Sequence, residues 1–490
     1  RRVVVKTIGN VQKDGQVRVV ASGALTDGAS VIVNANGTVS AVAGSATSTG
    51  TVAEFYDNRA EYTSLVFDSV NNKVVVCYKD NATNQGKAVV GTVSGTSISF
   101  GSIATFTTNT ANYINSAFDV NSGKVVITYR DSSNSSYGTA VIGTVSGTSI
   151  SFGSPVVFQS VSTLDPFPSY DSNAQKTVIF YHDNTNATPE GIVGTVSGTS
   201  ISFGSPTIIE SGLGYRSEFW AAFDTTNNKH IVIYKNGYDS NHGYAVVATV
   251  SGTSVSFGTS AEFLAASLSY STVNYDPTSG KGFMFYRDAG SNLGYGQTAT
   301  ISGTSISFGT AVELTGSSTP AYGKAIYDPD NDNMVLTWND SGSGQQTFAG
   351  LATISGTAVS FSSVGQLSNF PSGEYMFTNA MTYDTNENRV VQAYTYLDAG
   401  APYPSKANVI LMASTNLTSE NFIGFSDGAF ADTQSAVINT ANTIDRNQTS
   451  LTAGQTYFVS PTDGALSTTA GSPSVTAGTA ISSTEIIVKG

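Results

Sequence analysis

The segment Ala140-Val-Ile-Gly-Thr-Val-Ser-Gly-Thr-Ser-Ile-Ser-Phe-Gly-Ser154 is one copy of a pattern that recurs along most of this 490-residue chain. Its Ser-Gly-Thr turn has glycines at Gly95, Gly147, Gly198, Gly252, Gly303 and Gly356. An aromatic residue followed by aspartate recurs independently, at Phe67-Asp68, Phe118-Asp119, Tyr170-Asp171, Phe223-Asp224, Tyr275-Asp276, Tyr327-Asp328 and Tyr383-Asp384. Because both markers keep one period, we infer seven copies of a unit about 52 residues long.

Each unit has the composition of four short β-strands joined by turns. In the first unit the expected strands, A to D, are Tyr62 to Asp68, Lys73 to Lys79, Lys87 to Val93, and a strand that begins at Ser97. Asn, Asp and Gly separate them, because these residues supply local hydrogen bonds or a positive φ angle. Strand B is continuously apolar, as in Val125-Val-Ile127, which predicts a strand covered on both faces.

Four-stranded units repeated around an axis make a β-propeller. We therefore expect an all-β fold, a seven-bladed β-propeller of four-stranded blades, with strand A next to the axis. The residues just before its aromatic position are mostly small, among them Ala117, Ser169, Ala222 and Ala325. A β-solenoid, the alternative repeat fold, usually has shorter rungs and needs capping segments.

The start of the repeats indicates how the blades close. Thr51 to Phe55 aligns with Ser102 to Phe106, the end of a D strand, yet no complete unit precedes it. We expect the segment around residues 30 to 55 to supply the outer strand of the last blade, which removes two open edges. The expected domains are an N-terminal β segment at 1–50, the propeller at 51–420 and a C-terminal β module at 421–490. Both end segments contribute to one small β module.

The composition excludes several classes of function. Only 12% of residues are charged and the net charge is −13, so the protein is repelled by phosphate backbones and by anionic membrane surfaces. We expect no nucleic-acid partner. No run of 18 apolar residues occurs, so we expect no membrane insertion. The single cysteine, Cys77, lies in an apolar run and is interpreted as a buried small hydrophobic residue.

Residues that carry catalysis are scarce. The three histidines, His182, His230 and His242, lie in different units, which leaves little material for a Ser-His-Asp triad or a His-rich metal site. The aspartates after strand A occur in all seven units and are interpreted as turn caps, whereas a glycosidase uses one carboxylate pair once. The acidic segment 328–333 lacks the Gly and terminal Glu of an EF-hand loop. We predict no catalysis, no cofactor and no metal site.

Strand B ends in a repeated motif, a tyrosine followed by a basic residue and then Asp or Asn. It reads Tyr78-Lys79-Asp80, Tyr129-Arg130-Asp131, Tyr181-His182-Asp183, Tyr234-Lys235-Asn236 and Tyr286-Arg287-Asp288. Two interpretations remain open. The basic residues form ion pairs between neighbouring blades beside a packed tyrosine, or they form a set of cations on one face of an acidic protein.

The segments between strands D and A and between strands B and C vary most, whereas the C–D turn is nearly invariant. In a propeller these variable segments share one face. Loops that bind a partner differ in sequence from one repeat to the next, whereas turns that only reverse the chain stay the same. We predict that a ligand docks on this D–A/B–C face. The candidate binding residues are Trp220, Tyr215, Arg216 and Tyr238, because binding energy concentrates on Trp, Tyr and Arg. The alternative is that Trp220 fills the channel wall and Tyr238 is an ordinary loop aromatic residue.

The repeats resemble those of a known class of protein. The segments 121–131 and 140–154, with Leu451-Thr-Ala-Gly-Gln-Thr-Tyr-Phe-Val459 near the C-terminus and Ala21-Ser-Gly-Ala-Leu25 near the N-terminus, are similar to repeat-bearing tail-fibre-like virion structural proteins of tailed phages, especially marine ones. The resemblance covers nearly the whole chain and carries no catalytic residues to transfer. Similar repeats also occur in bacterial surface proteins.

The resemblance implies a virion appendage, tail-fibre-like or capsid-attached, at the virion surface. The expected partners are a host-surface glycan or receptor and other virion proteins, and a homo-oligomer, a trimer in a fibre, is compatible with this role. An aromatic face with Asn and Asp beside it suits sugars, which offer apolar C–H patches and hydroxyl groups. The alternatives are a purely structural or decoration protein that mediates assembly, a bacterial surface adhesin, or a secreted glycan-active enzyme.

Overall fold

The computed structural model describes residues 15–45, 47–210, 215–314, 319–343, 346–367, 375–397, 403–412, 414–461, 463–471 and 473–489. These residues form strands and turns, and their one helix is a single 3-10 turn at Ser341–Ser343, so the expected all-β class is confirmed. No helix in these ranges is long and apolar enough to span a membrane. The chain divides into two compact units, Ser48–Leu411 and a unit built from Arg1–Thr47 together with Met412–Gly490.

The larger unit consists of seven successive antiparallel repeats, numbered here by their inner strands. The inner strands are β7 (Ala60–Asp68), β11 (Ala104–Asp119), β15 (Val156–Asp171), β20 (Arg216–Asp224), β25 (Leu268–Asp276), β30 (Pro320–Asp328) and β34 (Tyr375–Asp384). The second strands are β8 (Lys73–Asp80), β12 (Lys124–Asp131), β16 (Lys176–Asp183), β21 (Lys229–Asn236), β26 (Lys281–Asp288), β31 (Asn333–Asp340) and β35 (Arg389–Leu397).

The outer half of each repeat completes the sheet. The third strands are β9 (Gln85–Ser94), β13 (Tyr137–Ser146), β17 (Thr188–Ser197), β22 (His242–Ser251), β27 (Gly294–Ser302), β32 (Gln346–Ser355) and β36 (Ser405–Leu411). The outer strands of the first six repeats are β10 (Ser97–Phe100), β14 (Ser149–Phe152), β18 (Ser200–Phe203), β23 (Ser254–Phe257), β28 (Ser305–Phe308) and β33 (Ala358–Gln366). The short strands β19 (Thr207–Ile208), β24 (Ala261–Leu264) and β29 (Val312–Glu313) extend the outer edges of repeats 3, 4 and 5.

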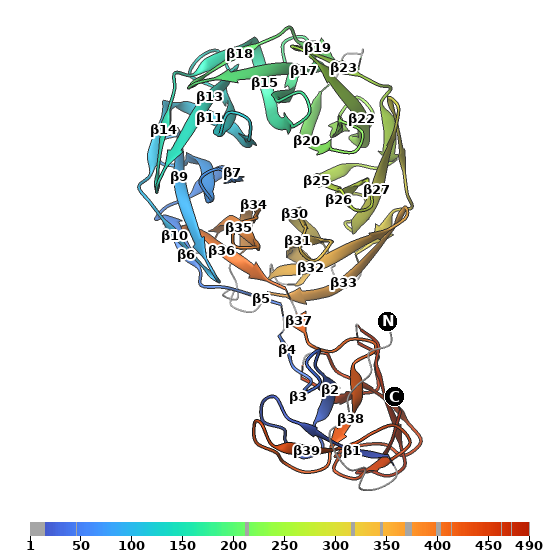
Figure 1. The fold of residues 1–490 in the computed structure, drawn as a ribbon. Helices are drawn as coiled ribbons and strands as arrows, with labels where there is room; N and C mark the ends of the chain where they lie inside the picture. The colour runs from blue at the N-terminus through green and yellow to red at the C-terminus, as the bar shows by residue number, and fades with distance from the viewer. Residues whose placement is uncertain are drawn as a thin grey trace. The chain divides into compact units, whose positions relative to one another are not determined.

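Figure 1 shows the repeats arranged around an axis, with the inner strands nearest to it. Each inner strand contacts the inner strands of the repeats before and after it, and β34 of the last repeat contacts β7 of the first. This radial arrangement of small antiparallel sheets is that of a β-propeller. It places the ends of the inner strands and the starts of the second strands at one end of the axis, and the ends of the second strands at the other, because the two strands run antiparallel.

The apolar second strands form the core between neighbouring repeats. Val74 and Tyr78 of β8 are completely buried, as their continuously apolar run predicted. A phenylalanine from the outer edge of one repeat packs into the next repeat. Phe158, which lies in the part of β15 that pairs with β13, has its ring centroid 5.2 Å from that of Tyr181 and 5.8 Å from that of Phe203. These aromatic contacts join repeat 2 to repeat 3.

The aspartates that end the inner strands cap the following turns. The Asp68 carboxylate accepts hydrogen bonds from the backbone N–H groups of Val70 and Asn71, at 3.0 and 2.9 Å. Equivalent bonds are accepted by Asp119, Asp171, Asp224, Asp276, Asp328 and Asp384. The interpretation of these aspartates as turn caps is confirmed, and the acidic segment 328–333 is one of these turns.

Strands β5 (Ser48–Thr49) and β6 (Ala53–Tyr56) pair with β36 and supply the outer edge of repeat 7. Gly50, between them, meets repeat 1, since a Cβ atom at this position would lie 1.9 Å from the carbonyl oxygen of Thr96. The Thr51 N–H donates to that same oxygen at 3.0 Å. The expectation that this outer strand begins near residue 30 is wrong, because residues 30–33 pair within the other unit.

The second unit is built from both ends of the chain. One sheet has the order β1-β39-β38-β2-β3, formed by β1 (Gln16–Val20), β39 (Ser435–Asn439), β38 (Phe422–Ser426), β2 (Ser30–Val33) and β3 (Val39–Ala41). The other has the order β40-β44-β43-β41-β42, formed by β40 (Ile444–Asp445), β44 (Ile486–Val488), β43 (Thr476–Ala480), β41 (Thr456–Val459) and β42 (Leu466–Ser467). A two-stranded pair joins β4 (Gly44–Ser45) to β37 (Ser414–Thr415). The expected boundaries at 50 and 420 therefore move to 47 and 412.

Candidate functional site

A β-bulge interrupts each inner strand where it pairs with the end of the second strand. The register of pairing with the second strand shifts between Glu61 and Ser64 in β7, and equivalent shifts occur in the other six inner strands. In six repeats one bulge residue has a φ angle between 47° and 55°: Tyr62, Tyr113, Asp165, Glu218, Tyr270 and Tyr322. This conformation costs a non-glycine residue about 1–2 kcal/mol. The surrounding sheet therefore holds six strained residues at equivalent positions.

All six strained residues line one cavity of about 600 Å³ at the axis, which is bordered by every inner strand. Together with Phe377 of β34 they form what we call the bulge layer. Aromatic side chains occupy this layer in repeats 5, 6, 7, 1 and 2, and carboxylates occupy it in repeats 3 and 4. Neighbouring aromatic rings touch, with centroids 5.2 Å apart for Tyr62 and Tyr113 and 4.9 Å apart for Tyr270 and Tyr322.

A second layer of cavity residues lies two positions further along six of the inner strands. We define the second layer as Ser64, Asn115, Phe167, Trp220, Thr272, Lys324 and Ala380. Its small polar members join neighbouring repeats, since the hydroxyl oxygens of Ser64 and Ser116 lie 2.8 Å apart and the Asn115 amide donates to the carbonyl oxygen of Pro166 at 3.2 Å. The bulky members of this layer are Phe167, Trp220 and Lys324.

Lys324 and Trp220 meet inside the cavity although they come from β30 and β20. The Lys324 ammonium nitrogen lies 3.6 Å from the centroid of the Trp220 ring, a cation–π contact. Thr272, the second-layer residue of the intervening β25, is small enough to allow this contact. Burial lowers the pKa of Lys324 to about 7 because desolvation disfavours the charged form, and the carboxylate of Glu218 opposes that shift. Among the described residues the ammonium group makes no hydrogen bond or ion pair.

The two carboxyl groups of the bulge layer lie side by side in β15 and β20. Asp165 accepts a hydrogen bond from the backbone N–H of Glu218 at 3.1 Å. Burial raises the pKa of Asp165 to about 6, which this hydrogen bond opposes and the nearby Glu218 carboxylate supports. The Glu218 carboxylate forms an ion pair with Lys235. Asp165 therefore changes its charge close to neutral pH, while Glu218 has a cationic partner.

The basic residues that end the second strands reach the bulge layer. Lys79 lies 3.0 Å from Glu61, and Lys235 forms its ion pair with Glu218. Each pair joins the inner and second strands of one repeat, so the interpretation as ion pairs between neighbouring blades is wrong for these two cations. The tyrosine beside the basic position is buried in each motif, as expected: Tyr78, Tyr129, Tyr181, Tyr234 and Tyr286.

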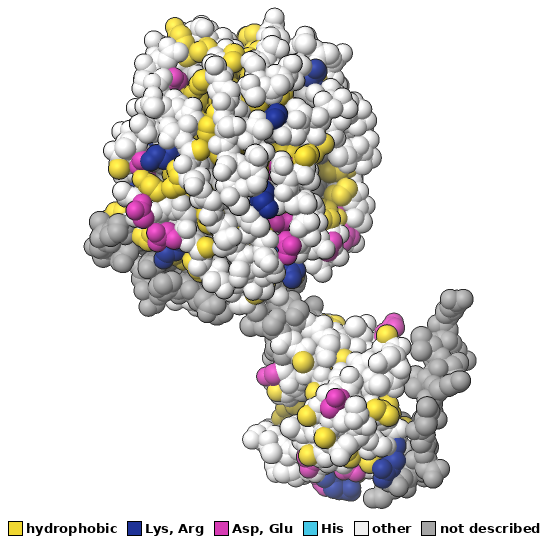
Figure 2. Space-filling view, turned by 60° about the vertical axis from the view of Figure 1, so that its left-hand side comes forward, with side chains coloured by type: hydrophobic (Ala, Val, Ile, Leu, Met, Phe, Trp, Pro, Cys, Tyr) yellow, Lys and Arg dark blue, Asp and Glu magenta, His cyan; other side chains and the backbone are white. Residues whose placement is uncertain are grey.

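Cations surround the cavity at the end where the second strands finish, which we call its mouth, although the described lining residues themselves carry three carboxyl groups and one cation, Lys324. The cations that contact the bulge layer or second layer are Arg59, Lys79, Arg130, Lys235, Arg287 and Lys324. The carboxylates among the described lining residues are Glu61, Asp165 and Glu218. Elsewhere charges are sparse, and Figure 2 shows a surface made mostly of uncharged side chains and backbone. A positive mouth on a chain of net charge −13 favours the approach of anions.

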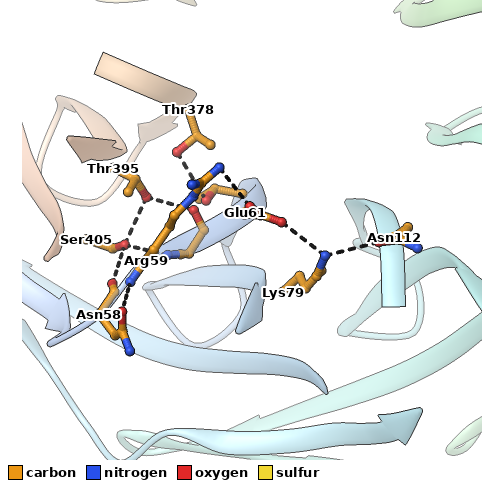
Figure 3. Close-up of polar contacts among 10 residues, drawn as sticks. Asn58, Arg59, Glu61, Lys79, Asn112, Thr378, Thr395 and Ser405 are labelled. Atoms are coloured by element: carbon orange, nitrogen blue, oxygen red, sulfur yellow. Dashed lines mark hydrogen bonds and ion pairs between the residues drawn. The ribbon is translucent and has the colours of Figure 1, made fainter. Parts of the chain in front are cut away.

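Figure 3 shows how the charged groups are held where repeat 7 meets repeat 1. Glu61 accepts from Arg59 at 2.8 Å and from Lys79 at 3.0 Å, and Lys79 also reaches Asn112 of repeat 2 at 3.3 Å. The Ser405 hydroxyl accepts from the backbone N–H of residue 60 at 2.8 Å and donates to the carbonyl oxygen of residue 58 at 2.9 Å. The contacts between repeats 7 and 1 thus hold the backbone on both sides of Arg59.

The structure divides the candidate residues predicted from the sequence between the cavity and its surroundings. Trp220 lies in the cavity wall. Tyr215 and Tyr238 lie on loops outside the cavity lining, with 44% and 77% of their surface exposed. A hydrogen bond of 2.8 Å from the Gly237 N–H to the Tyr215 carbonyl oxygen joins these two loops. Arg216 begins β20, but its side chain lies outside the described residues.

Sequence reasoning missed Asp165, Glu218 and Lys324 as cavity residues. The signal that identifies them is their register within the repeat. In six repeats the bulge residue lies five positions before the aromatic residue of the aromatic–aspartate pair, and the second-layer residue lies three positions before it. Aligning the repeats at that pair brings all of these residues into two columns.

Other titratable residues lie away from the cavity lining. His230 is completely buried, and burial lowers its pKa. Cys77 is buried, and burial raises the pKa of its thiol to about 12, in keeping with its interpretation as a hydrophobic residue. Within the described ranges one group of side chains has spacing suited to a metal, namely Asp239, His242 and Glu262, with His242 Nδ1 2.7 Å from Glu262 Oε1.

No protein-family model and no characterised protein sequence matches this chain. Solved structures are similar to it at low identity. Trypanosoma rangeli sialidase matches at 13% identity with a TM-score of 0.39, covering 81% of this chain and 59% of the sialidase. The C-terminal WD40 domain of Sif2 matches at 10% identity with a TM-score of 0.41, covering 74% and 99%. A mutant of AofleA from Arthrobotrys oligospora matches at 9% identity with a TM-score of 0.38, covering 69% and 93%.

Proposed function

We propose that this chain is a non-enzymatic binding protein, a phage virion appendage that binds a host-surface glycan at the axial cavity of a seven-bladed β-propeller. Three observations support a propeller of seven blades. The chain has seven repeats, and each inner strand contacts the next from β7 to β34, which in turn contacts β7. In addition, β5 and β6 pair with β36 of the last repeat. In this description the N-terminal strands complete the last blade and cover the outer edge of β36.

The bulge layer carries the proposal of ligand binding. Four tyrosines, one aspartate and one glutamate adopt the same strained conformation, and all six line the same cavity. Strain of this kind persists only where the surroundings impose it, and it clusters at binding sites. A volume of about 600 Å³ lies within the range of small-ligand pockets, about 300–1,000 Å³.

The chemistry of the cavity suits a sugar. Aromatic rings of the bulge layer offer flat apolar surfaces for the C–H face of a pyranose. Polar groups of the second layer, such as Ser64 and Asn115, lie two positions further along the strands and suit hydroxyl groups. Tyr215 and Tyr238 provide exposed aromatic surface outside the cavity, where the neighbouring residues of an oligosaccharide would rest.

The virion assignment is supported by the resemblance of the repeats to tail-fibre-like proteins. It predicts that the protein is a component of phage particles. Antibodies against the purified chain should label intact particles from the source material in electron micrographs. Labelling of bacterial cell envelopes instead would support the adhesin alternative.

A glycan array probed with the purified chain tests the binding function. We expect binding to a set of surface glycans and no release of sugar during the assay. Replacing Tyr215 and Tyr238 together with alanine should weaken binding by tenfold or more, since aromatic contact residues contribute about 2 kcal/mol each. The melting temperature should stay within about 2 °C, because exposed side chains contribute little to stability.

Val70, an apolar residue with 61% of its surface exposed on the turn at the opposite end of the inner strand, provides the matched control. Val70→Ala should leave binding unchanged. Unchanged binding by the double tyrosine variant would remove these two residues from the site. Sugar release that depends on one carboxylate would show that the protein is an enzyme.

A further inference from the structure

We infer that the glycan bound in the cavity carries an acidic group, a carboxylate or a sulfate ester, which is held by Lys324 over the face of Trp220. This inference rests on the proposed glycan binding and specifies the class of sugar. It is carried by three features of the cavity: an ammonium group without an anionic partner, an excess of cations around it, and aromatic surfaces beside it.

Lys324 lines the cavity with its side chain partly exposed, and none of the described carboxylates forms an ion pair with it. Its nitrogen lies over the π face of Trp220, 3.6 Å from the ring centroid, and both residues line the cavity. Lysine is almost never buried unpaired, because desolvating its charge is costly. An acidic group entering the cavity would accept these N–H groups and restore the charged form, whereas a neutral hydroxyl compensates the charge poorly.

The surrounding charges leave a net positive site. Glu218 is engaged by Lys235, and Glu61 is shared by two cations. Arg130 and Arg287 have only neutral hydrogen-bond partners in the described structure, through serine hydroxyl groups at 2.8 and 3.1 Å. The one carboxyl group left to oppose these cations and Lys324 among the described lining residues is that of Asp165, whose pKa is raised to about 6. The mouth therefore attracts an anion and does not itself neutralise Lys324.

The aromatic residues explain why the anion should belong to a sugar. Trp220 packs on Phe167 with centroids 4.8 Å apart, and the tyrosines of the bulge layer stand around the same space. A free inorganic anion would use Lys324 and leave these surfaces uncovered. An acidic pyranose places its charged substituent on the lysine and its ring against the aromatic side chains.

An array of matched glycan pairs tests this inference. One arm pairs uronate oligosaccharides with their carboxyl-reduced forms, and the other pairs sulfated oligosaccharides with their desulfated forms. The native chain should bind acidic members at least tenfold more strongly than their neutral partners. Lys324→Met should abolish this preference. Lys324→Gln serves as a second variant if the methionine variant does not fold, with the melting temperature as the check.

Lys229 provides the control cation. It starts β21, at the other end of the second strand from the mouth, and donates to the carbonyl oxygen of Gly303. Lys229→Met should keep the full preference for acidic glycans. Equal binding of acidic and neutral members, or a preference that survives both Lys324 substitutions, would overturn the inference while glycan binding stands. Binding to no member of the array would instead defeat the proposed function, and the inference with it.

Discussion

Replacing Phe55 with alanine tests whether the N-terminal strands hold the repeats closed. Phe55 lies on β6, which pairs with β36 of repeat 7, yet its ring packs against repeat 1. Its centroid lies 5.5 Å from that of Tyr78 and 5.8 Å from that of Phe100. The apolar core around it contains buried residues of both repeats, including Val76 and Val409. The side chain therefore bridges the first and last repeats.

The expected loss of stability follows from the burial of this ring. Only 4% of the residue is exposed, so truncation forfeits nearly the full transfer free energy of the side chain and leaves a cavity. Such substitutions cost about 3–5 kcal/mol. For a cooperative unit of the size of Ser48–Leu411, an unfolding entropy of about 2 cal/mol/K per residue converts this loss into a fall in melting temperature of about 4–7 °C.

Phe158 is the matched control, because it occupies the equivalent position between repeats 2 and 3. It is 6% exposed, with its ring 5.2 Å from that of Tyr181 and 5.8 Å from that of Phe203. Differential scanning calorimetry of Phe55→Ala and Phe158→Ala should show similar falls. If the Phe55 variant melted within 1 °C of the native chain while the Phe158 variant fell by several degrees, the closure would contribute nothing to stability and the reasoning would fail.

Two further predictions concern the pH dependence of binding and the close approach at Gly50. Binding of an acidic glycan should weaken by about tenfold between pH 5.5 and pH 8. Over this range Lys324, with its pKa lowered to about 7, loses its positive charge, and Asp165, with its pKa raised to about 6, gains a negative one. Binding titrations at fixed ionic strength measure this change, and an affinity that does not vary with pH would contradict it. Gly50→Ala should lower the unfolding free energy by about 1–3 kcal/mol, because the new Cβ would lie 1.9 Å from a backbone oxygen of repeat 1. Gly365→Ala, with no atom within 4 Å of the new Cβ, should change it by less than about 0.5 kcal/mol, and equal effects in thermal melts would refute the close approach.

The repeats were predictable because their markers act locally. Asp68 caps a turn two and three residues away, so its chemistry requires aspartate wherever that turn recurs. Gly95 has a φ angle of 60° in the C–D turn, a conformation that favours glycine. Requirements this local leave a period in the sequence, and the period together with four strands in each unit indicates radially repeated sheets.

The limits of the closing strand were harder to predict because strand-forming residues occur on both sides of it. Residues 30–33 and 53–56 both read as short strands, yet the former pair with β38 and the latter with β36. The two segments differ in the strands with which they pair, and these strands lie far away in the sequence. Thr51 to Phe55 could be recognised because it copies a segment of the repeat, and no such copy marks the earlier residues.

Trp220 was predicted, but Asp165 and Glu218 escaped prediction because the bulge reverses the usual inference from composition. A tyrosine at a strand start usually packs in a core, and a glutamate there usually faces water. At position 218 and its equivalents, a positive φ angle instead turns the side chain towards the axis. That backbone conformation is imposed by pairing on both sides of the bulge, which a single strand does not reveal.

The charge around the cavity also depends on the assembled structure and could not be predicted from the overall composition. A net charge of −13 is an average over a chain in which charged residues are rare, and it argues correctly only about ligands that meet the whole surface. A ligand in the cavity meets a different set, because repeated second-strand ends bring Lys79, Lys235 and Arg287 to one mouth from units far apart in sequence. Lys324 joins them only because a small residue in repeat 5 lets it reach Trp220 of repeat 4. An acidic chain can therefore surround a pocket with cations whenever its repeats place a few of them at the same distance from one axis.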